Sequence, residues 1–129
     1  MDIKKDIETR EDIRKFLIAF YEQVKQDPLL GVIFNEVAHV NWDHHIPLIT
    51  DFWESILLDN PVYSNNAMAV HHALNKIYTL QEKHFKTWLA IFNTIIDAMY
   101  EGPVTVLAKK RAASIASLMQ HSMGNSKIL

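Results

Sequence analysis

Glycine and proline are scarce in this sequence, and their scarcity limits the folds that the chain can adopt. Only three glycines, at positions 31, 102 and 124, and four prolines occur among the 129 residues. An all-β domain needs many tight turns, which depend largely on these two residues. The sequence therefore predicts an all-α fold, and its length corresponds to a single domain spanning residues 1–129.

Four segments carry apolar residues at helical spacing, which is the main sequence signal for amphipathic helices. They span residues 9–27, 41–59, 79–103 and 104–123, and a shorter helix is expected over residues 66–74. In the first three segments the expected apolar faces comprise Ile13, Phe16, Leu17, Phe20 and Val24; Ile49, Phe52, Trp53, Ile56 and Leu57; and Phe85, Trp88, Leu89, Phe92, Ile95, Ile96 and Met99.

The last segment is expected to bury one face as well. This face consists of Val104, Leu107, Ala108, Ile115, Leu118 and Met119. Arg111 falls inside it, and we interpret this residue as one whose stem packs on apolar surface while its charge reaches solvent. Phe34, in the mostly apolar connector after the first helix, is also expected to be buried.

Local signals mark the ends of the expected helices. Thr9 with Asp12 and Thr79 with Glu82 have the spacing of capping boxes, which satisfy backbone N–H groups of a first helical turn. Asn41 is a suitable N-cap for the second long helix. The expected stops of the first and third helices are Asp27-Pro28 and Gly102-Pro103.

Composition excludes several classes of site and partner. The chain has no cysteine, which rules out disulfides, thiolate metal sites and covalent haem attachment through a CxxCH motif. The net charge of −2 gives no basic face for nucleic acid. The charged N-terminal segment is not a signal peptide, and no apolar run reaches the roughly 20 residues of a membrane span. We therefore expect a cytoplasmic monomer with no membrane or nucleic-acid partner.

Three of the seven histidines lie between Ala69 and Phe85. In a short helix His71 shares a face with small or flexible apolar residues, whereas His72 shares its face with polar residues and looks towards solvent. His84 lies at the edge of the next helix, beside its apolar face. Periodicity therefore identifies His71 as the inward histidine of this group.

Polar-tipped aromatic side chains occur on the other helices. His45 lies near the centre of its apolar face while His44 points away, and Tyr21 and Trp88 lie on two further helices. Tyr, His and Trp combine an apolar body with one polar tip. An inward histidine opposite such a set suits haem, because iron takes a neutral imidazole on one side and its diatomic ligand needs hydrogen-bond donors on the other.

Other interpretations remain open at this point. An inward histidine is often an ordinary core residue with its hydrogen bonds satisfied. A di-iron helical bundle would need Glu-x-x-His pairs on two helices, and the chain offers one such spacing, Glu36 to His39, in a loop-like stretch. A helical interaction module without a cofactor would use the same aromatic residues simply as core.

At these residues the chain resembles a known family, the truncated haemoglobins with their two-over-two helical sandwich, and specifically the third group. The resemblance runs from about Ile13 to Met119 and rests on several quoted stretches. These are "FYEQV", "DPLLGVIFN", Trp42 with His45 three residues later, "FWESILL", Val70-His71 and "HFKTWLAIF". The chain also lacks the paired glycines that the other two groups typically carry at helix corners.

The resemblance implies a role for each matching residue. His71 matches the proximal iron ligand, and Tyr21, His45 and Trp88 match the polar set on the distal side of the haem. His84 matches a structural position at the start of its helix. The apolar pocket positions are Phe20, Phe34, Phe52 and Trp53. The stretch "HHALNK" departs from the usual pattern after the proximal histidine, and there His72 and Lys76 are candidate partners of the haem propionates.

The resemblance also implies a function. A protein with this site binds O2, NO or CO at non-covalent haem b. The polar distal set favours retention of the ligand, or NO and peroxide chemistry, over simple O2 transport. Turnover would need an external reductase, because the sequence has no nicotinamide or flavin motif. A reversible O2 carrier or sensor is the alternative.

Overall fold

The expected all-α architecture is confirmed by the computed structural model, which describes residues 3–37, 41–63 and 80–126, with side chains to residue 35 in the first range and to residue 121 in the last. No strand occurs in these ranges. The helices are α1 (Arg10–Gln26), α2 (Leu30–Val32), the π-helix η1 (Ile33–Val37), α3 (Trp42–Leu57), α5 (Glu82–Met99) and α6 (Pro103–Ser126). The helix expected over residues 66–74 lies outside the described ranges.

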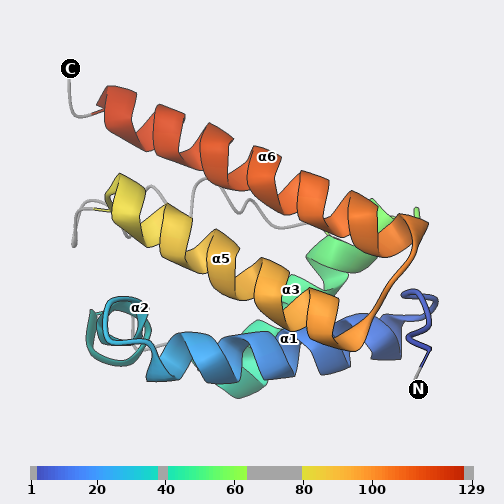
Figure 1. Ribbon diagram of the computed structural model, residues 1–129. Coiled ribbons are helices and arrows are strands. Elements are labelled where there is room, and N and C mark those ends of the chain that lie inside the picture. Colours follow the sequence, from blue (N-terminus) through green and yellow to red (C-terminus); the bar gives the residue numbers. More distant parts are fainter. Residues whose placement is uncertain (1–2, 38–40, 64–79, 127–129) are drawn as a thin grey trace.

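The long helices form two packed pairs (Figure 1). α5 and α6 run side by side in opposite directions, and α1 packs against both α3 and α5. The core lies where α1, α3 and α5 meet, and its large, fully buried side chains include Phe20, Phe92 and Leu17. This arrangement brings the apolar faces of three helices to one place.

The first helix agrees with its sequence signals in detail. The Thr9 hydroxyl accepts a hydrogen bond from the Asp12 N–H at 3.2 Å, and the Asp12 carboxylate accepts one from the Thr9 N–H at 3.1 Å, which completes the expected capping box. The helix ends at Gln26, just before Asp27-Pro28. The predicted apolar face is buried throughout, and Tyr21 at its edge is buried too.

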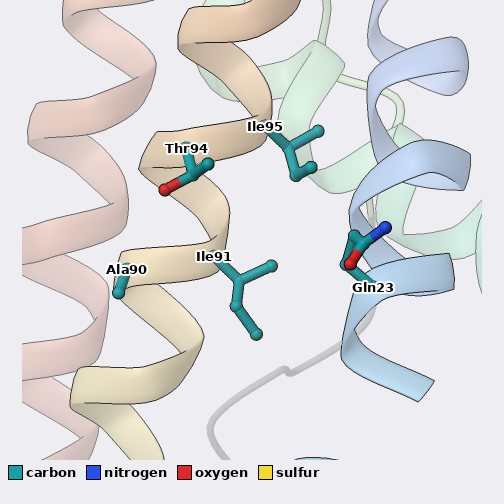
Figure 2. Close-up of a pocket in the computed structure, with 5 residues that line it drawn as sticks. All are labelled: Gln23, Ala90, Ile91, Thr94 and Ile95. Carbon is teal, nitrogen blue, oxygen red and sulfur yellow. The ribbon is translucent and has the colours of Figure 1, made fainter. Parts of the chain in front are cut away.

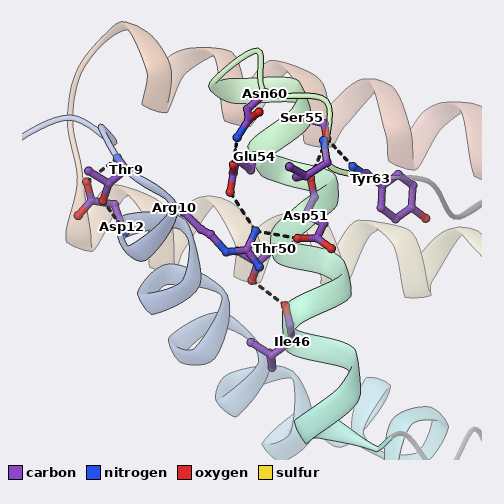
Figure 3. Close-up of polar contacts among 11 residues, drawn as sticks. Thr9, Arg10, Asp12, Ile46, Thr50, Asp51, Glu54, Ser55, Asn60 and Tyr63 are labelled. Carbon is purple, nitrogen blue, oxygen red and sulfur yellow. Dashed lines mark hydrogen bonds and ion pairs between the residues drawn. The ribbon is translucent and has the colours of Figure 1, made fainter.

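The second long helix buries a different face from the one expected. Asn41 caps α3 as predicted, but the buried residues are Thr50, Trp53 and Glu54, while Ile49 and Phe52 are only half-buried. Polar groups on this face are satisfied locally, since the Thr50 hydroxyl donates to the Ile46 carbonyl oxygen at 2.6 Å (Figure 3). The face can therefore pack against α1 despite its polarity.

An ion-pair network connects α1 and α3. Arg10 donates to Asp51 at 2.7 Å and to the buried Glu54 at 2.9 Å, and Asn60 donates to the other oxygen of Glu54 (Figure 3). A buried carboxylate with several donors is stabilised in its ionised form. The network therefore fixes the C-terminal half of α3 against the start of α1.

The cap of α5 differs from the expected one. The helix begins at Glu82, with Gln81 as N-cap, so the predicted capping box of Thr79 and Glu82 is wrong. The box is formed instead by Gln81 and His84, whose Nδ1 accepts a hydrogen bond from the Gln81 N–H at 2.8 Å. A histidine nitrogen replaces the usual carboxylate, which the search for Thr and Glu could not detect.

The buried face of α6 is also rotated from the predicted one. It consists of Thr105, Ala108, Ala112, Ala116 and Met119. Leu118 is 60% exposed and Arg111 lies at the surface, so neither belongs to the buried face. Three alanines at helical spacing allow α6 to approach α5 closely, and closeness of approach outweighs the larger apolar side chains.

A segment before α1 caps the start of α6. The Asp6 carboxylate accepts hydrogen bonds from the N–H groups of Val104 and Thr105, at 2.8 and 2.9 Å, and from the Thr105 hydroxyl at 2.8 Å. Gly102 adjoins this contact with a φ of +147°, and a Cβ there would lie 2.5 Å from the Asp6 side chain. We call the contact between Asp6 and the first turn of α6 the Asp6 clamp.

Candidate functional site

Tyr21 lies at the centre of the candidate site. The capped and fully packed α1 fixes its backbone, and the side chain is 6% exposed. Its ring lies 5.9 Å from Phe34, 5.1 Å from Trp42 and 5.3 Å from His45, measured between ring centroids. Residues from α1, η1 and α3 therefore meet around one phenol ring.

The first turn of α3 brings His45 to this ring. The Asn41 side chain accepts a hydrogen bond from the His44 N–H at 3.3 Å, and the Asn41 carbonyl accepts one from the His45 N–H at 2.8 Å. His45 is half-buried and meets Tyr21 edge to face, whereas His44 is exposed, as the periodicity predicts.

Trp88 on α5 completes the polar set. Its ring lies 5.7 Å from Phe20, the fully buried residue next to Tyr21. Burial raises the pKa of the Tyr21 hydroxyl, and a hydrogen bond from the Trp88 indole N–H offsets only part of this rise. The Tyr21 hydroxyl is therefore protonated at neutral pH and can donate a hydrogen bond. The structure thus brings together Tyr21, His45 and Trp88, which the sequence distributes over three helices.

The predicted apolar positions lie around this set at different depths. Phe20 is fully buried beneath Tyr21, and Phe34 on η1 is half-buried, less than expected. Trp53 is buried and packs against Phe92, which makes it part of the core, and Phe52 contacts Trp53 at 5.5 Å. Phe52 is half-buried and faces away from that core contact towards Tyr63, at 5.2 Å.

Trp42 is a site residue that the search for chemistry did not select. It stacks against Phe34 at 5.7 Å and contacts both Tyr21 and His45. The available signal was its spacing of three residues from His45, which places both side chains on one side of the first helical turn. We call Tyr21, Phe34, Trp42, His45 and Trp88 the aromatic cluster.

His71, His72 and Lys76 lie outside the described residues, as does His39. No group of three or more His, Cys, Asp or Glu side chains suitable for a metal occurs in the ranges that the structure describes. His84 is buried and its Nδ1 caps α5, so the structural position that the resemblance implies for it is confirmed.

A shallow groove lies apart from the aromatic cluster. It has a volume of about 200 Å³ and is lined by Gln23 on α1 and by Ala90, Ile91, Thr94 and Ile95 on α5 (Figure 2). None of the residues predicted to bind a cofactor or ligand lines it. The groove therefore adds nothing to the candidate site.

Comparison with known proteins identifies the family. No family model matches the chain. A group 3 truncated haemoglobin of Campylobacter jejuni is 29% identical over 117 residues, covering 88% of this chain and 90% of that protein. The crystal structure of a group III truncated haemoglobin from C. jejuni superimposes with a TM-score of 0.82 and 27% identity, covering 94% of this chain and 95% of the other. The chain belongs to the group III truncated haemoglobins.

The residues of this truncated haemoglobin fit the haem that its family implies. The half-buried apolar side chains of Phe34, Phe52 and Trp88 offer the apolar contacts that a flat ring system needs. Next to them, the Tyr21 hydroxyl and the Trp88 indole offer polar hydrogens beside an otherwise apolar wall. No helix among the residues described for this truncated haemoglobin is long and apolar enough to cross a membrane.

Proposed function

We propose that the chain binds non-covalent haem b through His71 and holds a diatomic ligand, O2 or NO, beside Tyr21, His45 and Trp88. One observation supports this most strongly. Polar side chains from α1, α3 and α5 converge in the aromatic cluster, where the surroundings are otherwise apolar. The absence of cysteine means that any haem is held without thioether bonds.

Haem would supply the iron atom to which the diatomic ligand binds. The role of the chain is to hold that ligand with hydrogen bonds. Tyr21 is protonated because burial raises its pKa, so its O–H is a donor, and the Trp88 indole N–H is a second donor. A hydrogen bond to a partly charged acceptor contributes about 1–3 kcal/mol.

Two donors on one ligand favour retention over transport. At about 1.4 kcal/mol for each factor of ten, one bond of this kind slows ligand release about 5- to 150-fold. A second donor slows it further, which is unsuitable for a carrier that must release O2 readily. We therefore rank retention of the ligand, with NO or peroxide chemistry driven by an external reductase, above reversible O2 transport.

Absorption spectroscopy of haem-reconstituted protein tests the haem ligand. The parent and His72→Ala should show the intense Soret band of bound haem, whereas His71→Ala should lose most of its haem affinity. His72 is a matched control because it is the adjacent histidine. Loss of haem from His72→Ala or His84→Ala, with retention by His71→Ala, would make the assignment wrong.

Stopped-flow displacement of O2 from the reduced parent separates retention from transport. Slow release supports retention. Fast release that Tyr21→Phe and Trp88→Phe leave unchanged would contradict it and favour the carrier.

A further inference from the structure

Trp42 occupies the outer side of the aromatic cluster. It is the first residue of α3, and its half-buried indole lies 5.1 Å from Tyr21 and 5.4 Å from His45. Its contact with His45 is edge to face, with an angle of 84° between the rings. The position of the Trp42 ring therefore limits the space into which the His45 ring can turn.

The first turn of α3 is weakly fixed by its own backbone. Pro47 has no N–H, so the helical hydrogen bond that residue 47 would donate to the Asp43 carbonyl is missing. The bonds to Asn41 hold the turn together as a unit. Contacts made by its side chains with α1 therefore contribute strongly to where this turn, and His45 with it, lies.

Lys25 supplies such a contact from α1. Its ammonium lies 5.1 Å from the centroid of the Trp42 ring and pairs with Glu22 at 2.7 Å. Its backbone is fixed as well: Asn35 donates to the Lys25 carbonyl at 3.2 Å, and a Cβ on Gly31 would come within 2.6 Å of that oxygen. A cation held over an indole face attracts it, so Lys25 stabilises Trp42 in this position.

We propose that Lys25 and Trp42 act together as positioning residues, in which the ammonium of Lys25 holds the Trp42 ring and the ring keeps His45 against Tyr21, so that the pair limits access of ligands to the distal side. The inference rests on the proposed function. Weakening the Lys25–Trp42 contact lets the first turn of α3 move outwards and take His45 away from Tyr21. Ligand access then becomes faster.

Flash photolysis of the CO complex measures access directly. Lys25→Met keeps the apolar stem and removes the charge, and it should raise the CO association rate constant about two- to fivefold. Lys25→Arg should restore the parent rate, because guanidinium also stacks on indole. Trp42→Leu, which removes the ring, should raise the rate at least as much as Lys25→Met.

Lys109→Met is the matched control. Lys109 pairs with Asp97 at 2.8 Å and is 33% exposed, compared with 28% for Lys25, but it lies on α6 away from the aromatic cluster. Its loss should leave CO association unchanged. An equal effect of Lys25→Met and Lys109→Met, or no effect of either, would overturn the proposal.

Fluorine NMR of protein labelled with fluorotryptophan gives a second measurement, which does not depend on ligand binding. The Trp42 resonance, assigned with Trp42→Phe, should shift in Lys25→Met and stay in place in Lys109→Met. A parent without a Soret band would overturn the proposed function, and this inference with it. A parent that binds haem and whose CO kinetics and Trp42 resonance ignore Lys25→Met would overturn this inference alone.

Discussion

Tyr21 remains a hydrogen-bond donor to unusually high pH, because burial raises its pKa above the ordinary value of 10.0. We predict that Tyr21→Phe and Trp88→Phe each speed O2 release about 5- to 150-fold, while CO, which is less polar when bound, responds less. The raised pKa adds a pH condition. The neutral hydroxyl persists as the pH rises through 10, so the O2 release rate of the parent should stay constant there. Stopped-flow measurements across this range check both statements.

His45 is expected to move rather than to act as a second fixed iron ligand. It lies in the first turn of α3, where Pro47 removes a backbone donor, and its ring packs against Tyr21 and Trp42. The ferric protein at neutral pH should therefore show the absorption spectrum of haem with a single histidine ligand. A dominant bis-histidine spectrum would contradict this expectation.

The individual residues of the site could be predicted only in part. Tyr21 and Trp88 stand out as polar-tipped residues on or beside apolar faces, and the resemblance to a family grouped them with His45. Nothing in the local sequence reports that Trp42 packs against residues of α1 and η1, because that contact depends on how separate helices meet. The same holds for Lys25, which reads as an ordinary surface charge in the last turn of its helix.

At the scale of single helices, α6 offers a direct comparison between buried and exposed positions. Ala112 is fully buried on the face towards α5, whereas Leu118 is 60% exposed. We predict that Ala112→Leu destabilises the fold by about 1–3 kcal/mol through overpacking, and that Leu118→Ala changes it by less than about 0.5 kcal/mol. Urea unfolding followed by circular dichroism measures both, and the reverse order would contradict the observed rotation of the helix.

The two outermost long helices show why local patterns succeed or fail. α1 has large apolar residues at regular spacing and a complete capping box, so its face and start are correct from sequence. α6 buries alanines and Thr105 instead of its largest apolar residues, and alanine carries little weight in an apolar pattern. α5 uses His84 as a capping side chain, a choice that becomes visible only when its ring nitrogen is placed beside the Gln81 N–H.

For the molecule as a whole, buried carboxylates control stability in acid. Burial alone would raise the pKa values of Asp6 and Asp12, but their hydrogen bonds outweigh it and lower both from the ordinary 3.8. For Glu54 the bond from Arg10 is the largest effect and lowers the pKa from 4.5. A lowered pKa in the folded state gives stability that is complete above the ordinary value and is lost as the pH falls through the lowered one.

We therefore predict that the protein holds its helicity down to about pH 4.5 and loses stability progressively below it. Asp6→Asn should unfold more easily at neutral pH, by about 1–2 kcal/mol, and should show a shallower loss in acid because one titrating group is gone. Urea unfolding at a series of pH values tests this. Equal pH slopes for the parent and Asp6→Asn would contradict the role given to Asp6.

The Asp6 clamp also bears on how long the folded molecule lasts. It joins residues 98 and 99 positions apart, so it forms only when nearly the whole chain between them has been arranged. Contacts of such long range carry a large loop-closure cost and tend to form after the rate-limiting step of folding. Losing a late contact speeds unfolding and barely changes the rate of folding. The clamp thus acts as a kinetic lock, which lengthens the lifetime of the native state without helping the chain to reach it.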